Sequence, residues 1–298
     1  MCFGAAQRAF FFVNRNIKSK RVKIILSRKG FDSSYGGMPS PIMPDGTLLS
    51  MPIPSDVETD RTYLELMWNG MRYSDIIRSL SPGTRIEAGS HCHLDPDIRA
   101  DVVDRPDGWR SAFGQEMAAL VHLCNHGVGL GDIFLFFGWF RQTELSDGRL
   151  RYVQGAPDLH IIYGYLQAGD MIAREEDVPE WLAGHPHNTA ERWKRGRNAI
   201  YVAAERLSIQ PELAGAGCLT VSDRLVLTKK GCSRRVWDLP DFMRNVPMTY
   251  NADAWQDEGF VSAARGQEFV FDANDDVIGW VKDMLLSGSR WNSPTAVI

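Results

Sequence analysis

IFLFFGWF, residues 133–140, is the longest apolar run of the chain, and LHIIYGYLQ, residues 159–167, is a second apolar segment that follows it. Both segments are of strand length and rich in aromatic and β-branched residues, which favours buried strands over helices. The polar segment 141–157 joins them. We therefore predict that residues 132–140 and 159–167 form an antiparallel pair of strands.

Other segments add strands and helices to this pair. Further strands are predicted at residues 22–26, 199–205 and 224–227. The clearest helix is predicted at Trp109–His126, whose apolar residues recur on one face, and a last helix at 277–286. Because no internal repeat or low-complexity linker divides the chain, we predict a single α+β domain with flanking helices, whose core is a mixed β-sheet or a partial barrel. It spans residues 22–286, between a disordered N-terminal extension (1–21) and a flexible tail (287–298).

The composition is that of a globular protein in a reducing compartment. Hydrophobic residues make up 44% of the 298 residues and charged residues 23%. The five cysteines are scattered and include no C-x-x-C pair, so no disulfide framework is expected. No stretch approaches the roughly 20 apolar residues of a membrane helix. We therefore expect a cytoplasmic protein that does not contact membranes. Its net charge of −4 gives no overall attraction to nucleic acid.

Six of the seven histidines occur in closely spaced pairs. The pairs are His91/His93, His122/His126 and His185/His187. Such spacing projects both imidazoles to one side of a strand or helix, which suits metal ligation. The alternative is that they are hydrogen-bonded or solvent-facing side chains. Because the sequence does not show that separate pairs meet in space, we predict no metal site, and a metal-dependent hydrolase is the least favoured function.

Two polar loops carry candidate binding and catalytic groups. The loop 27–37 follows a predicted strand and offers Arg28, Lys29 and Asp32 beside three glycines, which suits anion or nucleotide binding. Its alternative role is a structural turn capped by Asp32. The segment His93–Asp97 places an imidazole and two carboxylates on a turn stiffened by proline. This combination suits acid–base chemistry, although a turn with a capping carboxylate fits equally well.

Two further segments suit contact with a nucleotide or nucleic acid. The basic segment RWKRGR contributes Arg192, Arg195 and Arg197, and the segment RGQE contributes Arg265, Gln267 and Glu268. The first combines cations with an aromatic ring, which favours phosphate contact and base stacking. The second combines a guanidinium, an amide and a carboxylate, which can read base edges. A solvated basic loop and a loop salt bridge are the respective alternatives.

Taken in order, the motifs of this chain resemble those of a known family. The motifs are KIILSRKGFDSSYGG, HLDPD, GWRSAFGQEMAALVHL, GVGLGDIFLFFGWFR, HIIYGYLQAG, HPH, NAIYVA, GAG, LVLT, W-x-LP and RGQEF. Together they resemble the nucleotide modification associated domain family, third type, over about residues 22–275. That family belongs to bacteria and phages and is linked to systems that modify bases in DNA. Within it, GDIFLFF and HIIYGYLQAG resemble the strand pair of PUA-like domains such as EVE and ASCH, small barrels that hold a base.

The resemblance implies a protein that acts on a nucleotide or on DNA, by one of two routes. The first is an enzyme of base or nucleotide modification with a polar cleft. Its catalytic candidates are Asp32, Asp95, His185 and His187. Its binding candidates are Arg28, Lys29, His93, Asp97, Gln115, Arg265, Gln267 and Glu268. The second route is a non-catalytic reader, which holds a modified base in a PUA-like partial barrel with an aromatic cage. No cofactor, reaction or oligomeric state is predicted.

Overall fold

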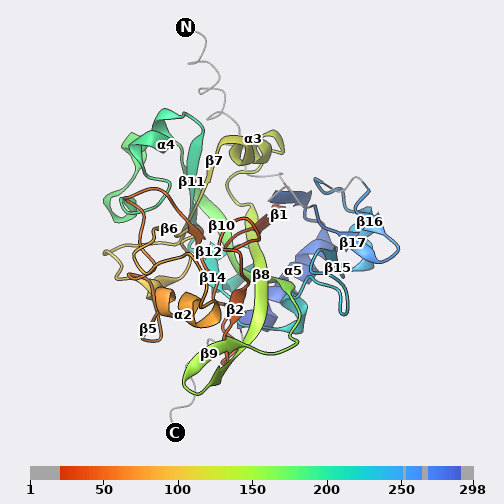
Figure 1. The fold of residues 1–298 in the computed structure, drawn as a ribbon. Helices are drawn as coiled ribbons and strands as arrows, with labels where there is room; N and C mark the ends of the chain where they lie inside the picture. Colours follow the sequence, from red (N-terminus) through yellow and green to blue (C-terminus); the bar gives the residue numbers. More distant parts are fainter. Residues whose placement is uncertain (1–20, 251–252, 264–267, 290–298) are drawn as a thin grey trace.

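One large mixed β-sheet organises the structure, a computed structural model that describes residues 21–250, 253–263 and 268–289 (Figure 1). The main path through the sheet has the order β18-β1-β8-β10-β11-β7. In that order the strands are Glu268–Asp272, Lys23–Arg28, Ile133–Ser146, Leu159–Ile172, Asn198–Ala203 and Ala112–Glu116. Strand β1 runs parallel to β8, and the other neighbours on this path are antiparallel.

Shorter strands extend this sheet and form small separate sheets. Strands β2 (Ser40–Ile42) and β9 (Arg149–Tyr152) pair with β8, and β14 (Ala216–Cys218) pairs with β10. The small sheets are β3 (Ile53–Pro54) with β6 (Cys92–His93), β4 (Met67–Trp68) with β5 (Met71–Arg72), β12 (Arg206–Leu207) with β13 (Gln210–Ala214), and β15 (Val236–Trp237) with β17 (Gly259–Val261) and β16 (Trp255–Gln256).

The α-helices flank the sheet. They are α2 (Tyr73–Leu80), α3 (Met117–Asn125), α4 (Ala190–Lys194) and α5 (Asp275–Ser289). In Figure 1, α2 lies to the left of β8 and α5 to the right. Over the described ranges, no helix combines the length and the apolar character that crossing a membrane requires.

The predicted central strand pair is confirmed. Strands β8 and β10 pair antiparallel, with Leu135 opposite Tyr165 and Phe140 opposite Leu159. Both strands are longer than predicted, because the end of β8 pairs with β9 and the end of β10 pairs with β11. The side chains of Phe134, Phe136 and Phe137 are almost fully buried, as their strong apolar character requires.

The sheet is curled, so that the two end strands of its main path approach each other. Gln115 of β7 donates a hydrogen bond from Nε2 to Glu268 of β18, although the two residues are 153 positions apart in the chain. Phe113, Phe134, Phe136 and Tyr201 pack against one another inside the curl. This contact joins the ends through side chains, and among the described strands no ladder closes the sheet into a barrel. The fold is therefore α+β with a mixed sheet and flanking helices, as predicted.

Several predicted element bounds require correction. Residues 112–116 of the predicted helix 109–126 form strand β7, because pairing with β11 satisfies their backbone groups and places Phe113 in the core. Met117, at φ 51°, lies where this strand turns into α3. The segment predicted as strand 224–227 instead contains a 3₁₀ turn at Asp223–Leu225.

The predicted tails lie almost entirely outside the described residues. Helix α5 continues to Ser289, three residues beyond the predicted end of the domain at 286, because Met284, Leu285 and Gly288 pack into the interior. Residues 1–20 and 290–298, which make up nearly all of the predicted extension and tail, are outside the described ranges.

Candidate functional site

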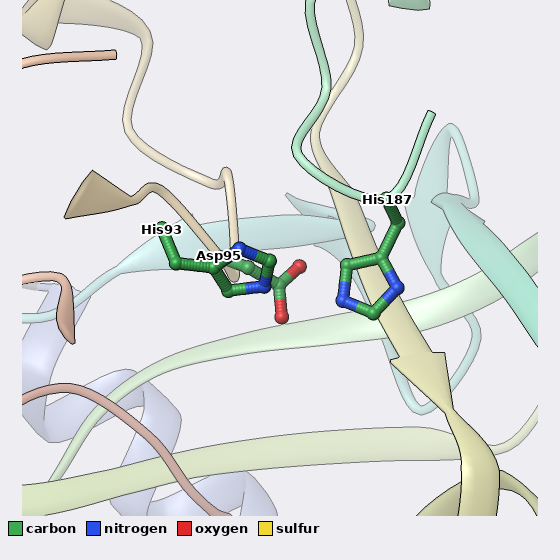
Figure 2. Close-up of side chains that lie close together, drawn as sticks. All are labelled: His93, Asp95 and His187. Atoms are coloured by element: carbon green, nitrogen blue, oxygen red, sulfur yellow. The ribbon is translucent and has the colours of Figure 1, made fainter. Parts of the chain in front are cut away.

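His93, Asp95 and His187 form the centre of the candidate site. One ligand-type atom of each residue lies within 4.8 Å of those of the other two. Figure 2 shows the Asp95 carboxylate between the two imidazole rings. His93 ends β6, Asp95 follows it in a loop, and His187 comes from the loop before α4. Members of two different histidine pairs therefore meet in space, which the sequence did not indicate.

The loop that carries Asp95 is fixed along the free edge of β7. Asp97 and Ala112 exchange two backbone hydrogen bonds, at 2.9 and 3.0 Å. The backbone N–H of Gly114 donates to Asp95 Oδ1 at 2.6 Å. An edge strand has N–H groups that no further strand satisfies, and here a loop and a carboxylate accept them. The sheet edge therefore positions Asp95.

Both outer imidazoles are oriented by a buried polar partner. His187 Nδ1 lies 2.8 Å from Asn198 Oδ1, and Asn198 Nδ2 donates to the carbonyl of His187 at 2.8 Å. His93 Nδ1 lies 3.5 Å from Oδ2 of Asp60, a buried carboxylate. Such partners fix the tautomer and the direction of a functional imidazole.

Gly114 also makes room for His187. A Cβ on residue 114 would overlap the His187 ring at Cγ and Cδ2. Glycine is therefore needed at this position so that the His187 ring can approach the backbone of β7, and not for an unusual backbone angle. The position of His187 thus depends on the sequence of β7.

Burial dominates the electrostatics of this group. It raises the pKa of Asp95, and Lys29 and His93 offset part of that rise. Burial lowers the pKa of His185 to about 3 and lowers the pKa of His187 well below its usual value. His185 and His187 are therefore neutral at neutral pH, with one lone pair on each ring.

A second polar group, centred on Glu268, lies inside the curl of the sheet. Ser27 Oγ donates to Glu268 Oε1 at 3.1 Å, Gln115 Nε2 donates to the same oxygen, and Lys29 Nζ lies 3.5 Å from it. Burial raises the pKa of Glu268 to about 7, against the opposing effect of Lys29. We name Ser27, Lys29, Gln115 and Glu268 the Glu268 group.

Lys29 links the two groups electrostatically. It lowers the pKa of both Asp95 and Glu268, and its ammonium lies 4.6 Å from the centre of the Phe113 ring. The curl of the sheet therefore places a lysine and two carboxylates near each other. The predicted residues brought together are Lys29, His93, Asp95, Gln115, His185, His187 and Glu268.

Other predicted site residues lie elsewhere. Arg28 lies on the opposite face of β1 from Lys29, as strand alternation requires. Burial lowers the pKa of His160 to about 3, and the charge of Arg28 adds to this effect. Asp32 accepts backbone hydrogen bonds from Ser34 and Tyr35, which is its alternative role as a turn cap. Asp97 is held by Arg105 through two hydrogen bonds, at 2.6 and 2.8 Å.

The predicted nucleic-acid residues differ in their engagement. Arg192 pairs with Glu116 at 2.5 Å, and its side chain is mostly buried. Arg195 pairs with Glu191 on the surface, and Arg197 is exposed. Arg265 and Gln267 lie outside the described residues, so only Glu268 of that predicted trio can be placed.

Sequence reasoning missed the groups that support the site. These are Ser27, Asp60, Gly114 and Asn198, together with the role of the edge of β7. A polar residue at the start of an apolar strand, as in Asn198-Ala-Ile-Tyr-Val-Ala203, was the available signal for Asn198. No local pattern pointed to Asp60, because its contact with His93 depends on the tertiary structure.

The arrangement can support two kinds of chemistry. His93, Asp95 and His187 offer two nitrogens and an oxygen to a metal ion. Glu268, whose pKa is raised to about 7, can accept or give a proton near neutral pH.

A family comparison agrees with the sequence resemblance. The family described as nucleotide modification associated domain 3 matches residues 23–272. The match covers most of the chain, which therefore belongs to this family. No curated protein and no solved structure matches the chain.

Proposed function

From membership of the nucleotide modification associated domain 3 family, we propose that the chain is an enzyme that modifies a nucleotide or a DNA base. The reaction takes place at the group of His93, Asp95 and His187, next to the Glu268 group. The observation that carries the proposal is that two buried carboxylates, a partly buried lysine and buried neutral imidazoles lie close together. Clustered groups with perturbed pKa values are more frequent at functional sites than elsewhere.

The two groups have different roles in this proposal. Asp95 and its imidazole neighbours form the reaction centre, because three side chains converge there. Hydrogen bonds to Gly114 and Asn198 already orient Asp95 and His187. Glu268 is the acid–base residue, and Lys29 keeps its charged form accessible near neutral pH by opposing the effect of burial. His93 and Lys29 have side chains that are 13% and 11% exposed, so the substrate approaches from their side.

The alternative of a non-catalytic reader has less support. A reader of the PUA-like kind requires aromatic rings open to a base. Here Phe134 and Phe136 are fully buried and pack on Phe113 and Tyr201. These aromatic residues of the central strands form part of the core and are not open to a base. The polar residues around Asp95 are therefore the better candidates for function.

Mass spectrometry of nucleosides tests this proposal. Cells with and without the gene are compared, and both genomic DNA and the free nucleotide pool are digested and analysed. We expect one nucleoside to be present only when the gene is present. If cells with and without the gene contain the same nucleosides in both fractions, under conditions where the protein is made, the enzyme hypothesis is wrong and the reader hypothesis is favoured.

A further inference from the structure

We propose that His93, Asp95 and His187 bind one divalent first-row transition metal ion. The inference rests on the same side chains as the proposed function, but it concerns what they hold and not what is modified. Two imidazoles and one carboxylate are the protein ligands of catalytic zinc sites and of non-haem Fe(II) sites. Three protein ligands leave positions open for substrate or water.

The hydrogen bonds of His187 leave its Nε2 free to bind a metal. Asn198 Nδ2 donates to the His187 carbonyl, so Asn198 Oδ1 is the atom that faces the ring. Because a carbonyl oxygen can only accept, His187 Nδ1 carries the proton and donates it to Asn198. The lone pair of the neutral ring then lies on Nε2.

His93 is placed by a nearby carboxylate and not by a hydrogen bond to Nδ1. Its Nδ1 lies 3.5 Å from the carboxylate of Asp60, which accepts a hydrogen bond from Ser55 and is itself buried. A carboxylate oxygen beside a ring nitrogen favours a proton on that nitrogen. The lone pair of His93 is therefore on Nε2, and Figure 2 shows the ring facing Asp95 with its far edge.

His185 is near the site but is a positioning residue and not a ligand. Its Nδ1 accepts the backbone N–H of His187 at 3.1 Å, so its proton is on Nε2. This Nε2 lies 3.6 Å from Asp95 Oδ1 and has no hydrogen-bond partner, although His185 is almost fully buried. Gly114 N–H donates to Asp95 Oδ1, which is also the oxygen 3.6 Å from His185 Nε2, so Oδ2 is the oxygen left for a metal.

The spacing of the three ligand atoms fits a metal after a small movement. In a tetrahedral site, ligand atoms bound at about 2.1 Å lie about 3.4 Å from one another, whereas here all separations are within 4.8 Å. Side-chain movements of about 1 Å therefore bring the three ligand atoms to bonding distance from one ion. The charge also fits, since Lys29 pairs with Glu268 and leaves the Asp95 carboxylate to face the ion.

Metal titration of the purified full chain tests this inference. The protein is first stripped with a chelator, and Zn²⁺ and Co²⁺ are then titrated by calorimetry, with Co²⁺ also followed by visible absorption. We expect one ion per chain and a rise in melting temperature with metal concentration, because a ligand that binds only the folded state stabilises it. The variants D95N and H187Q should lower the affinity at least 100-fold.

A matched variant and a second measurement keep the test decisive. H126Q removes an exposed histidine of another pair and should bind like the wild type. X-ray absorption of the zinc-loaded wild type should show two imidazole ligands. This measurement does not depend on the folding of any variant. Absence of binding at millimolar metal, a different imidazole count, or folded D95N and H187Q variants that bind like wild type would overturn the site. Metal binding without any gene-dependent nucleoside would instead count against the proposed function alone.

Discussion

Gln115 and Glu268 are joined by a hydrogen bond that connects the two end strands of the curled sheet, and Glu268 is almost fully buried where they meet. The side chains of Ser27 and Lys29 reach the same carboxylate from β1 and the residue after it. The fold therefore concentrates polar groups at one place in an otherwise apolar interior, where their protonation affects both stability and chemistry.

We predict that the E268Q variant has a different pH dependence of stability from the wild type. The folded-state pKa of Glu268, about 7, lies above its unfolded value of 4.5, so the folded protein binds the extra proton between these limits. The wild type therefore loses stability as pH rises from about 4.5 to 7, by up to about 3 kcal/mol. Glutamine does not titrate.

Urea unfolding at several pH values checks this prediction. The free energy of unfolding of E268Q, relative to that of the wild type, should rise between pH 4.5 and 7 and stay constant above. E191Q, which removes an exposed carboxylate, controls for the change of net charge. A difference that does not vary with pH would show that Glu268 is not the titrating group.

We predict that G114A weakens metal binding and stability together. The new methyl group overlaps the His187 ring, so the ring or strand β7 must move. Overpacking of this kind costs about 1–3 kcal/mol, and the displaced imidazole should lower metal affinity more than tenfold. G83A places a methyl group where nothing lies within 4 Å and should change neither quantity. Wild-type affinity in G114A would contradict the role of His187.

We predict that N198A lowers metal affinity by about 10–100-fold, the usual effect of removing a group that orients a metal-bound histidine. Asn198 holds both the ring and the carbonyl of His187. N188A is the matched control, because Asn188 follows His187 in its loop but bonds to Trp193 and Ala183. Equal affinities of N198A and N188A would argue that the His187 ring is oriented by packing alone.

We predict weak, salt-sensitive DNA binding through Arg195 and Arg197. The Arg195–Glu191 pair is exposed, and such pairs contribute little, so Arg195 can exchange Glu191 for a phosphate. Each phosphate contact contributes about −0.9 to the slope of log K against log salt. The double variant R195A/R197A should therefore flatten the slope by about two units.

The control for DNA binding is a second arginine pair. R234A/R235A removes arginines that contact Trp139 and the Ser262 carbonyl, and it should leave the slope unchanged. If it alone flattens the slope, the DNA contacts Arg234 and Arg235 in place of Arg195 and Arg197. Tight binding of free nucleotide without DNA binding at low salt would remove DNA from the partners.

The sequence predicted the strands better than their assembly. The pair β8 and β10 was predictable, because apolar runs of strand length that are rich in aromatic residues usually form buried strands. Strand β7 was not, since Phe113 and Met117 fit a helical period and only pairing with β11 decides between the two. Physically, tertiary contacts override local propensity at such segments.

The same limit applies to the candidate site. The histidine pairs and Asp95 were recognisable from spacing, and Glu268 from its polar neighbours. The convergence of His93 with His187 was not, because it requires β7 to bind the Asp95 loop at its edge and to pack against the His187 ring at Gly114. Local patterns name groups capable of chemistry, and the path of the chain determines which of them meet.

The most direct test of the proposed function is nucleoside mass spectrometry of cells that lack the gene and carry it back in variant form. Wild type, D95N and H126Q are expressed at equal levels, and folding of each is confirmed by thermal unfolding of the purified protein. We predict that wild type and H126Q restore a modified nucleoside and that D95N does not. If D95N restores the modified nucleoside as well as the wild type does, the assignment of Asp95 to the reaction centre is wrong. If the wild type restores no modified nucleoside, the proposal that the protein is a modifying enzyme is wrong.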